Sequence, residues 1–338
     1  MRPPFKPYHC SISKTFIAVA MMKAIEQEFF TLETNINDVL PFVVKNPNSP
    51  NTPIKIKHLV NHTSGLVDVE KTYLKGHSIL AGENVQNPLA QRLINEFGFG
   101  QNSSVLSLKD YLKAYFTEGG NLYSADNFAK GEAGSTFNYS NIASALAAYV
   151  IEVKAGKSFA DYCADNVLKP LGMNNTQWSI GADNRSKLAR LYFTKSEPLS
   201  YYTSATYPDG ELVTCNEDLT KFFIEMIKGF SGESTFLKKS SFDLMFQKSY
   251  LEGKKPTNMD EKEDNYGVFW VYFKNGRIGH TGGDLGVTTL MAFYPESKTR
   301  FIFLSNSEVE QLEGANQVKT VGDFQDVISA IKEFETNN

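Results

Sequence analysis

Apolar side chains recur on one side of the segment from Ser11 to about Phe29, at the spacing of an α-helix. This pattern predicts a largely buried helix. A second apolar helix is expected from about Asn141, with a stop at Gly156. An amphipathic helix should follow and end before Pro170, and Asn216 is expected to cap a further helix.

The last third of the chain has the pattern of strands and hairpins instead. The runs "YGVFWVYF" and "RIGHT" flank Lys274, Asn275 and Gly276, and "GVTTLMAFY" and "TRFIFLSN" flank the turn "PESK". We expect four antiparallel strands, followed by an amphipathic helix from about Val318 to Phe334. Since helices come first and the sheet last, the order predicts an α+β (mixed α/β) fold, with an antiparallel sheet flanked by helices and an all-helical part.

The middle of the chain is divided less clearly. "IKIKHLVNHTSGL" is typical of a short strand and a helix that stops at Gly65, and residues 67–135 have the composition of elaborated surface near a site. We expect one domain over residues 1–338. Within it, residues 30–230 should be mostly helical, with residues 67–135 as an insert, and residues 264–338 should form the sheet and the last helix.

Composition excludes several classes of function. The net charge of −4 and the absence of a basic block argue against a nucleic-acid partner. The sequence contains no run of eighteen apolar residues, so we expect no membrane span. Three cysteines without a CxxC spacing indicate neither a metal knuckle nor a disulfide framework. His58 and His62 have helical spacing, but the Glu of HExxH is absent, so we expect no metal and no cofactor.

Ser11 and Lys14 lie three residues apart at the start of the first helix, on one face and within reach of each other. A serine becomes a strong nucleophile when a base takes its proton, and a buried lysine can be that base. The alternative is structural: Ser11 would be a helix cap and Lys14 a solvated residue of the first turn.

Two further motifs strengthen the chemical interpretation. Tyr139 and Asn141 precede the second apolar helix, where a phenol could relay a proton and an amide could hold a substrate carbonyl. His280, Thr281 and Gly282 lie on a predicted strand whose edge could pair with a substrate. Taken singly, these motifs could equally be a half-buried aromatic with a helix cap, and a strand that ends in a glycine turn.

Ser-x-x-Lys, Tyr-x-Asn and His-Thr-Gly, in this order, resemble the motifs of the serine β-lactamase and penicillin-binding-protein superfamily. "LVNHTSGL", "LKPLGM" and "GHTGGDLGVTTLMAFYPES" also read like this family, in particular its branch of class C β-lactamases, D-alanyl-D-alanine carboxypeptidases and esterases. The similarity runs from about Phe5 to Asn306 and is weakest over residues 67–135. It implies a β-lactamase/transpeptidase-like fold.

The resemblance also implies roles. Ser11 would be the acylated nucleophile, Lys14 and Tyr139 would move protons as a coupled pair, and Asn141 would contact the substrate amide. The backbone N–H groups of Ser11 and Gly283 would form the oxyanion hole. The remaining substrate-binding positions would be His280, Thr281 and Gly282.

Two departures from the family pattern affect these expectations. His280 stands where β-lactamases of this branch usually have lysine, which favours a carboxypeptidase or an esterase and makes carboxylate binding depend on pH near neutrality. The strands that precede the first helix in the family are also missing, so we expect a truncated chain or a sheet edge completed by another copy in a homo-oligomer. Since the family is most often exported, a periplasmic or secreted location is expected by analogy, while the residues themselves leave the compartment open.

Two classes of function fit these observations. The first is a serine hydrolase that acts through an acyl-enzyme on small esters, D-amino-acid peptides or β-lactams. The second is a non-catalytic protein that retains the fold and binds penicillin or a peptidoglycan peptide. Either one would have a small molecule or a short peptide as its partner.

Overall fold

The computed structural model describes residues 10–101, 105–178, 185–194, 197–297 and 299–307, and the single positions 326, 329, 330 and 333. The predicted C-terminal helix therefore lies largely outside the described residues. No helix within the described part of the chain is long and apolar enough to cross a membrane.

The main sheet is antiparallel, with the strand order β10-β9-β8-β7-β6. Its strands are β6 (Glu263–Tyr266), β7 (Val271–Phe273), β8 (Ile278–Asp284), β9 (Val287–Phe293) and β10 (Arg300–Ser305). The hairpin at Lys274–Gly276 joins β7 to β8, and the second predicted hairpin joins β9 to β10. The α+β prediction is confirmed, and both hairpins turn at the predicted places in the sequence.

One predicted strand is wrong. "YGVFWVYF" forms the end of β6, a tight turn and β7, because Gly267 N–H donates to Trp270 O at 2.7 Å and Phe269 has a φ of +55°. Phe269 and Trp270 are fully buried. A continuous apolar run indicates burial, but it does not distinguish a strand from a buried turn.

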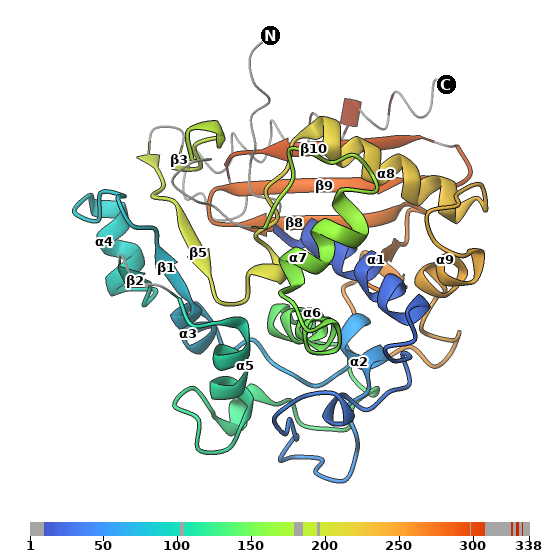
Figure 1. Cartoon of the computed structure of the whole chain (residues 1–338), viewed down its shortest axis with the longest axis horizontal. Helices are drawn as coiled ribbons and strands as arrows, with labels where there is room; N and C mark the ends of the chain where they lie inside the picture. Colours follow the sequence, from blue (N-terminus) through green and yellow to red (C-terminus); the bar gives the residue numbers. More distant parts are fainter. Residues whose placement is uncertain are drawn as a thin grey trace.

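Helices pack against the main sheet and make up much of the rest of the molecule (Figure 1). They are α1 (Ser13–Glu26), α2 (Ile56–Val60), α3 (Glu70–Tyr73), α4 (Pro88–Asn95), α5 (Leu108–Phe116), α6 (Asn141–Ala155), α7 (Phe159–Cys163), α8 (Asn216–Phe230) and α9 (Lys239–Phe246). A π-helical turn at Ala164–Leu168 continues α7 toward Pro170. α6 ends as predicted, with Gly156 in the left-handed conformation at φ +66°.

Three local predictions differ from the structure. The short strand expected before α2 is a single bridge between Asn35 and Lys55. Asn216 is the first residue of α8, so Cys215 occupies the N-cap position. Residues 67–135 contribute more than surface, since β1 (His77–Ile79) pairs with β2 (Gly100–Gln101) and with β5 (Tyr202–Ser204) in a second sheet. A third, two-stranded sheet joins β3 (Tyr192–Thr194) to β4 (Glu197–Pro198).

α1 is the central helix of the core. It packs against α6, and the short 3-10 turn before it, η1 (Cys10–Ile12), packs against β8 and β9 (Figure 1). Phe16 and Ile17 have no exposed surface, and burial of each such side chain contributes about 1.5–3 kcal/mol. This packing fixes the start of α1 against the strand that carries His280.

Gly279 allows β8 and β9 to approach closely. A Cβ atom at Gly279 would lie 2.1 Å from Met291 O and 2.6 Å from Ala292 Cβ, so the two strands would have to separate. We expect Gly279→Ala to lower the free energy of unfolding by at least about 2 kcal/mol, measured by urea denaturation. Gly283→Ala on the same strand is the control, because its Cβ meets nothing within 4 Å. Equal stabilities of the two variants would contradict the prediction.

Candidate active site

Lys14 is fully buried at the start of α1, where its ammonium group has three acceptors. Lys14 Nζ donates to Ser11 Oγ at 3.0 Å, to Asn141 Oδ1 at 2.7 Å and to Asp209 O at 2.9 Å. Ser11 lies in η1 and Ile12 holds the N-cap position of α1. The structural alternatives, a capping serine and a solvated lysine, are therefore wrong.

Tyr139 approaches the same serine from the segment before α6. Its hydroxyl lies 2.7 Å from Ser11 Oγ, and its ring centroid lies 5.2 Å from Lys14 Nζ. Burial raises the pKa of Tyr139, while Lys14 and the hydrogen bond to Ser11 lower it. Lys14 and Tyr139 thus both contact Ser11 Oγ and lie against each other, which places two proton-transfer groups at one hydroxyl.

Asn141 is held by the start of α6 and by a side chain from the 67–135 segment. Ser140, not Asn141, is the N-cap, and it accepts from Ala143 N–H. Asp68 accepts from Asn141 N–H at 2.7 Å, from Ile142 N–H at 3.0 Å and from Ser140 Oγ at 2.8 Å. A carboxylate at a helix N-terminus satisfies free N–H groups, so Asp68 fixes the position from which Asn141 reaches Lys14.

We expect Asp68→Ala to cost about 3 kcal/mol of stability, because two N–H groups at the start of α6 and the Ser140 hydroxyl lose their acceptor. The rate constant kcat should fall more than KM rises, since Asn141 would be displaced from Lys14. Asp68→Asn retains one acceptor oxygen, so its stability and its kcat should lie between those of the wild type and of Asp68→Ala. Denaturant titration and steady-state kinetics on one chromogenic ester measure both effects. An Asp68→Ala protein with normal kcat would contradict this positioning role.

His280 lies on β8 and faces Tyr139, with 6.3 Å between the two ring centroids. It is 2% exposed, whereas Thr281 and Gly283 are exposed and Gly282 is buried. Burial, followed by the charge of Lys14, lowers the pKa of His280 to about 3. The expected cationic histidine with carboxylate affinity that varies near neutral pH is therefore wrong, because desolvation keeps the ring neutral.

This neutral histidine affects stability at acid pH. An unfolded His280 binds a proton near pH 6.5, and the folded one does so only near pH 3. The unfolded chain thus binds more protons in this range, and His280 lowers the free energy of unfolding by about 1.4 kcal/mol per pH unit as pH falls from 6 to 4. In the His280→Asn protein, the free energy of unfolding measured by denaturant titration should fall less steeply with acid, by that amount per pH unit. If the free energy of unfolding depended on pH in the same way in the wild type and the variant, a neutral, buried His280 would be contradicted.

The two histidines that suggested a metal helix have structural contacts. His58 Nδ1 accepts from Lys55 N–H at 3.1 Å, and His62 Nδ1 accepts from Ser140 N–H at 3.3 Å. His62 also stacks near Tyr139, with 4.4 Å between ring centroids. No group of three metal-binding side chains occurs among the residues that the structure describes.

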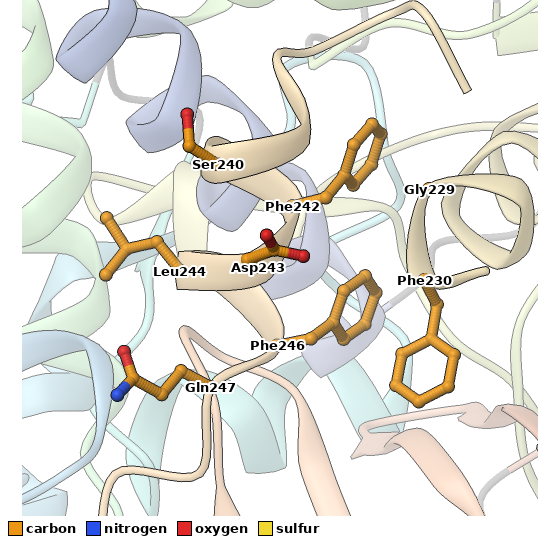
Figure 2. A pocket seen from close by; sticks show the side chains of 8 residues that line it. All are labelled: Gly229, Phe230, Ser240, Phe242, Asp243, Leu244, Phe246 and Gln247. Atoms are coloured by element: carbon orange, nitrogen blue, oxygen red, sulfur yellow. The ribbon is translucent and has the colours of Figure 1, made fainter. Parts of the chain in front are cut away.

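A separate pocket of about 660 Å³ lies between the end of α8 and α9 (Figure 2). The rings of Phe230 and Phe246 pack edge to face there, with 5.2 Å between their centroids, and the carboxylate of Asp243 lies 2.7 Å from Lys239 Nζ. The lining residues are Gly229, Phe230, Ser240, Phe242, Asp243, Leu244, Phe246 and Gln247. None of these lining residues places a base beside a nucleophilic group, so the candidate active site is the one around Ser11.

Sequence reasoning missed the residues that support Ser11 from a distance. Asp68 and Asp209 come from segments without a motif, and Asp209 reaches Lys14 through its backbone carbonyl. Tyr73 donates to Asp209 Oδ2 at 3.0 Å. The sequence contained one signal for such a residue. The first turn of α6 has no acidic side chain of its own, so a carboxylate from another segment could compensate the charge of its N-terminus.

Comparisons with known proteins bear on the fold and the family of this chain. The chain is 24% identical to "Penicillin-binding protein 4*" of Bacillus subtilis (strain 168) over 322 residues, which is 88% of this chain and 60% of the relative. Among solved structures, a D-amino acid amidase from Ochrobactrum anthropi SV3, complexed with L-phenylalanine amide, aligns at a TM-score of 0.63 and 19% identity, over 98% of this chain and 85% of that one.

An octameric penicillin-binding protein homologue from Pyrococcus abyssi aligns at a TM-score of 0.66 and 21% identity, over 92% of this chain and 63% of that chain. The present chain spans about 60% of the length of the Bacillus subtilis relative named above. The sequence profile described as Beta-lactamase matches residues 8–320, which include all three motifs. The chain belongs to the Beta-lactamase family.

Proposed function

We propose that this protein is a serine hydrolase that works through an acyl-enzyme on Ser11. The observation that carries the proposal is the convergence on one hydroxyl of Lys14 Nζ at 3.0 Å and Tyr139 OH at 2.7 Å. A nucleophile within hydrogen-bond reach of a base, which is itself oriented by further groups, is the arrangement that covalent catalysis requires.

In the proposed acylation step, Ser11 Oγ attacks a substrate carbonyl and its proton passes to the Lys14–Tyr139 pair. The backbone N–H groups of Ser11 and Gly283 stabilise the oxyanion. The pair then gives its proton to the leaving amine or alcohol as the C–N or C–O bond breaks. In deacylation, the same pair takes a proton from the water molecule that attacks the acyl ester, and it returns this proton to Ser11 Oγ as the acyl C–O bond breaks.

The proposed substrates are small esters and D-amino-acid peptides, ahead of β-lactams. Asn141, Thr281 and His280 would orient them, and a histidine in the place of lysine, which resembles the carboxypeptidase and esterase members of the family, supports these activities over an efficient β-lactamase. The amidase named above supports amides as a further class. The octameric relative supports self-association of this chain as part of the same proposal.

Mass spectrometry after exposure to a fluorophosphonate tests the proposal directly. We expect a single adduct on Ser11, formed more slowly in Tyr139→Phe because the proton relay is lost. An unmodified Ser11 in folded protein would contradict the proposal. If Ser11 is labelled and no acid or alcohol product accumulates from an ester substrate, the protein is a non-catalytic binding protein that has kept the fold.

A further inference from the structure

His62 lies next to Tyr139 in a backbone conformation that few residues adopt. Its φ of +59° is in the left-handed region, and its side chain has no exposed surface. The ring of Phe269, which also has a positive φ and is fully buried, packs edge-on against the His62 ring, with 5.6 Å between the centroids. Such conformations persist only where the surrounding structure imposes them, and they are frequent at active sites. The surroundings therefore hold this imidazole in one place.

His62 contacts three consecutive residues of the segment that carries the phenol. Asn138 N–H donates to His62 O at 2.8 Å, and Ser140 N–H donates to His62 Nδ1 at 3.3 Å. Between these two bonds the imidazole lies against the Tyr139 ring, with 4.4 Å between the centroids and 32° between the ring planes. The residues on either side of Tyr139 and the phenol ring itself thus share one partner.

The imidazole of His62 is neutral, so it acts on Tyr139 through its position and not through charge. Its Nδ1 accepts from a backbone N–H, so its proton lies on Nε2. Burial, followed by the charge of Lys14, lowers the pKa of His62 well below its ordinary value. Phe137 and Tyr266 pack edge-on against the ring, with centroid distances of 5.9 Å and 5.6 Å. This packing prevents the imidazole from turning away from Tyr139.

Tyr139 needs such a support because it precedes α6, which begins at Asn141, whereas Ser11 and Lys14 belong to η1 and α1. The Tyr139 hydroxyl has to remain 2.7 Å from Ser11 Oγ to take part in proton transfer. A displacement of about 1 Å in a reacting group can lower a rate about 100-fold. A rigid ring beside the phenol would limit this displacement.

We propose that His62 is a positioning residue for the reaction at Ser11: its stacked ring holds Tyr139 so that the phenol hydroxyl stays on Ser11 Oγ. This inference rests on the proposed function and adds a residue to its machinery. Because the contacts of His62 are with the Tyr139 segment, its effect on the rate passes through the Tyr139 hydroxyl.

The second-order rate constant for labelling of Ser11 by a fluorophosphonate measures this effect without turnover. His62→Asn suits a positive φ and keeps a side-chain acceptor, but it removes the stacked ring. We expect His62→Asn to slow labelling at least about tenfold, and His62→Phe, which keeps a ring beside Tyr139, to slow it at most about threefold. His62→Met, which fills more of the buried volume, gives the same reading if His62→Asn does not fold. Labelling of the ring-less variant at the wild-type rate would overturn the inference.

A double-mutant cycle with Tyr139→Phe separates positioning from general damage. This background has no hydroxyl to position, so His62→Asn should slow its labelling less than about twofold. The same slowing in both backgrounds would show a structural role alone and overturn the inference. His58→Asn is the matched control, because His58 Nδ1 also accepts from a backbone N–H, that of Lys55. It should change labelling less than about twofold in either background.

NMR of protein that carries ¹³C-labelled tyrosine detects the contact even if Ser11 is unreactive. The Tyr139 ring resonance is assigned by its loss in Tyr139→Phe. His62→Asn should shift this resonance, because the ring current of the stacked imidazole is lost, and His58→Asn should leave it in place. An unchanged Tyr139 resonance in His62→Asn would overturn the positioning role.

The two proposals fail separately. Labelling of Ser11 that does not depend on His62 would refute the positioning role and leave the hydrolase intact. A shifted Tyr139 resonance in a protein whose Ser11 never reacts would refute the hydrolase and leave His62 as the residue that holds Tyr139.

Discussion

Ser11→Ala is expected to abolish ester turnover, with a fall in kcat on the order of 10⁴- to 10⁶-fold. The reason is that both proton-transfer groups meet at Ser11 Oγ, and alanine offers no atom to acylate. The protein should remain folded, because Lys14 keeps its bonds to Asn141 and to the Asp209 carbonyl. Steady-state kinetics on a chromogenic ester, together with a thermal melt of the same sample, separate lost chemistry from lost structure.

Ser158→Ala is the matched control for this substitution. Ser158 caps α7 by accepting from Asp161 N–H, so its loss should cost about 1 kcal/mol of stability and leave kcat unchanged. A Ser11→Ala protein that retains a substantial part of the rate would mean that another group is the nucleophile.

Lys14→Met should lower kcat at least about 10³-fold, with a much smaller change in KM. Methionine fills most of the buried volume but can neither take the serine proton nor stabilise a charged Tyr139. It also leaves Asn141 Oδ1 and Asp209 O without their donor, which should cost about 1–3 kcal/mol for each buried acceptor. Kinetics should be measured well below the melting temperature of the variant.

Lys23→Met on the same helix is the control for lost stability alone. Lys23 lies in the last turn of α1, at the other end of the helix from Lys14, and its Nζ donates to Phe236 O at 2.5 Å, so its replacement should destabilise the protein without lowering kcat. If Lys14→Met kept a normal kcat and lost only stability, Lys14 would be a structural residue and the proposed pair would be wrong.

The sequence by itself determined the local features of this protein. Ser11 and Lys14 meet because residues three apart share a helix face, and the hairpin between β7 and β8 forms where Asn275 and Gly276 favour a turn. Gly156 ends α6 because glycine takes a positive φ without steric cost. Each of these features depends on neighbours within a few residues, so a pattern in the sequence is enough to predict it.

Tertiary structure decided the features that depend on distant segments. Tyr139 reaches Ser11 across 128 positions, and Asp68 holds the start of α6 across more than seventy. His280 is neutral because packing removes it from water and places it near Lys14, and the run before Trp270 turns because Phe269 N–H donates to Val60 O. Burial and long-range contacts set pKa values and chain direction, and neither is encoded in the spacing of residues along the chain.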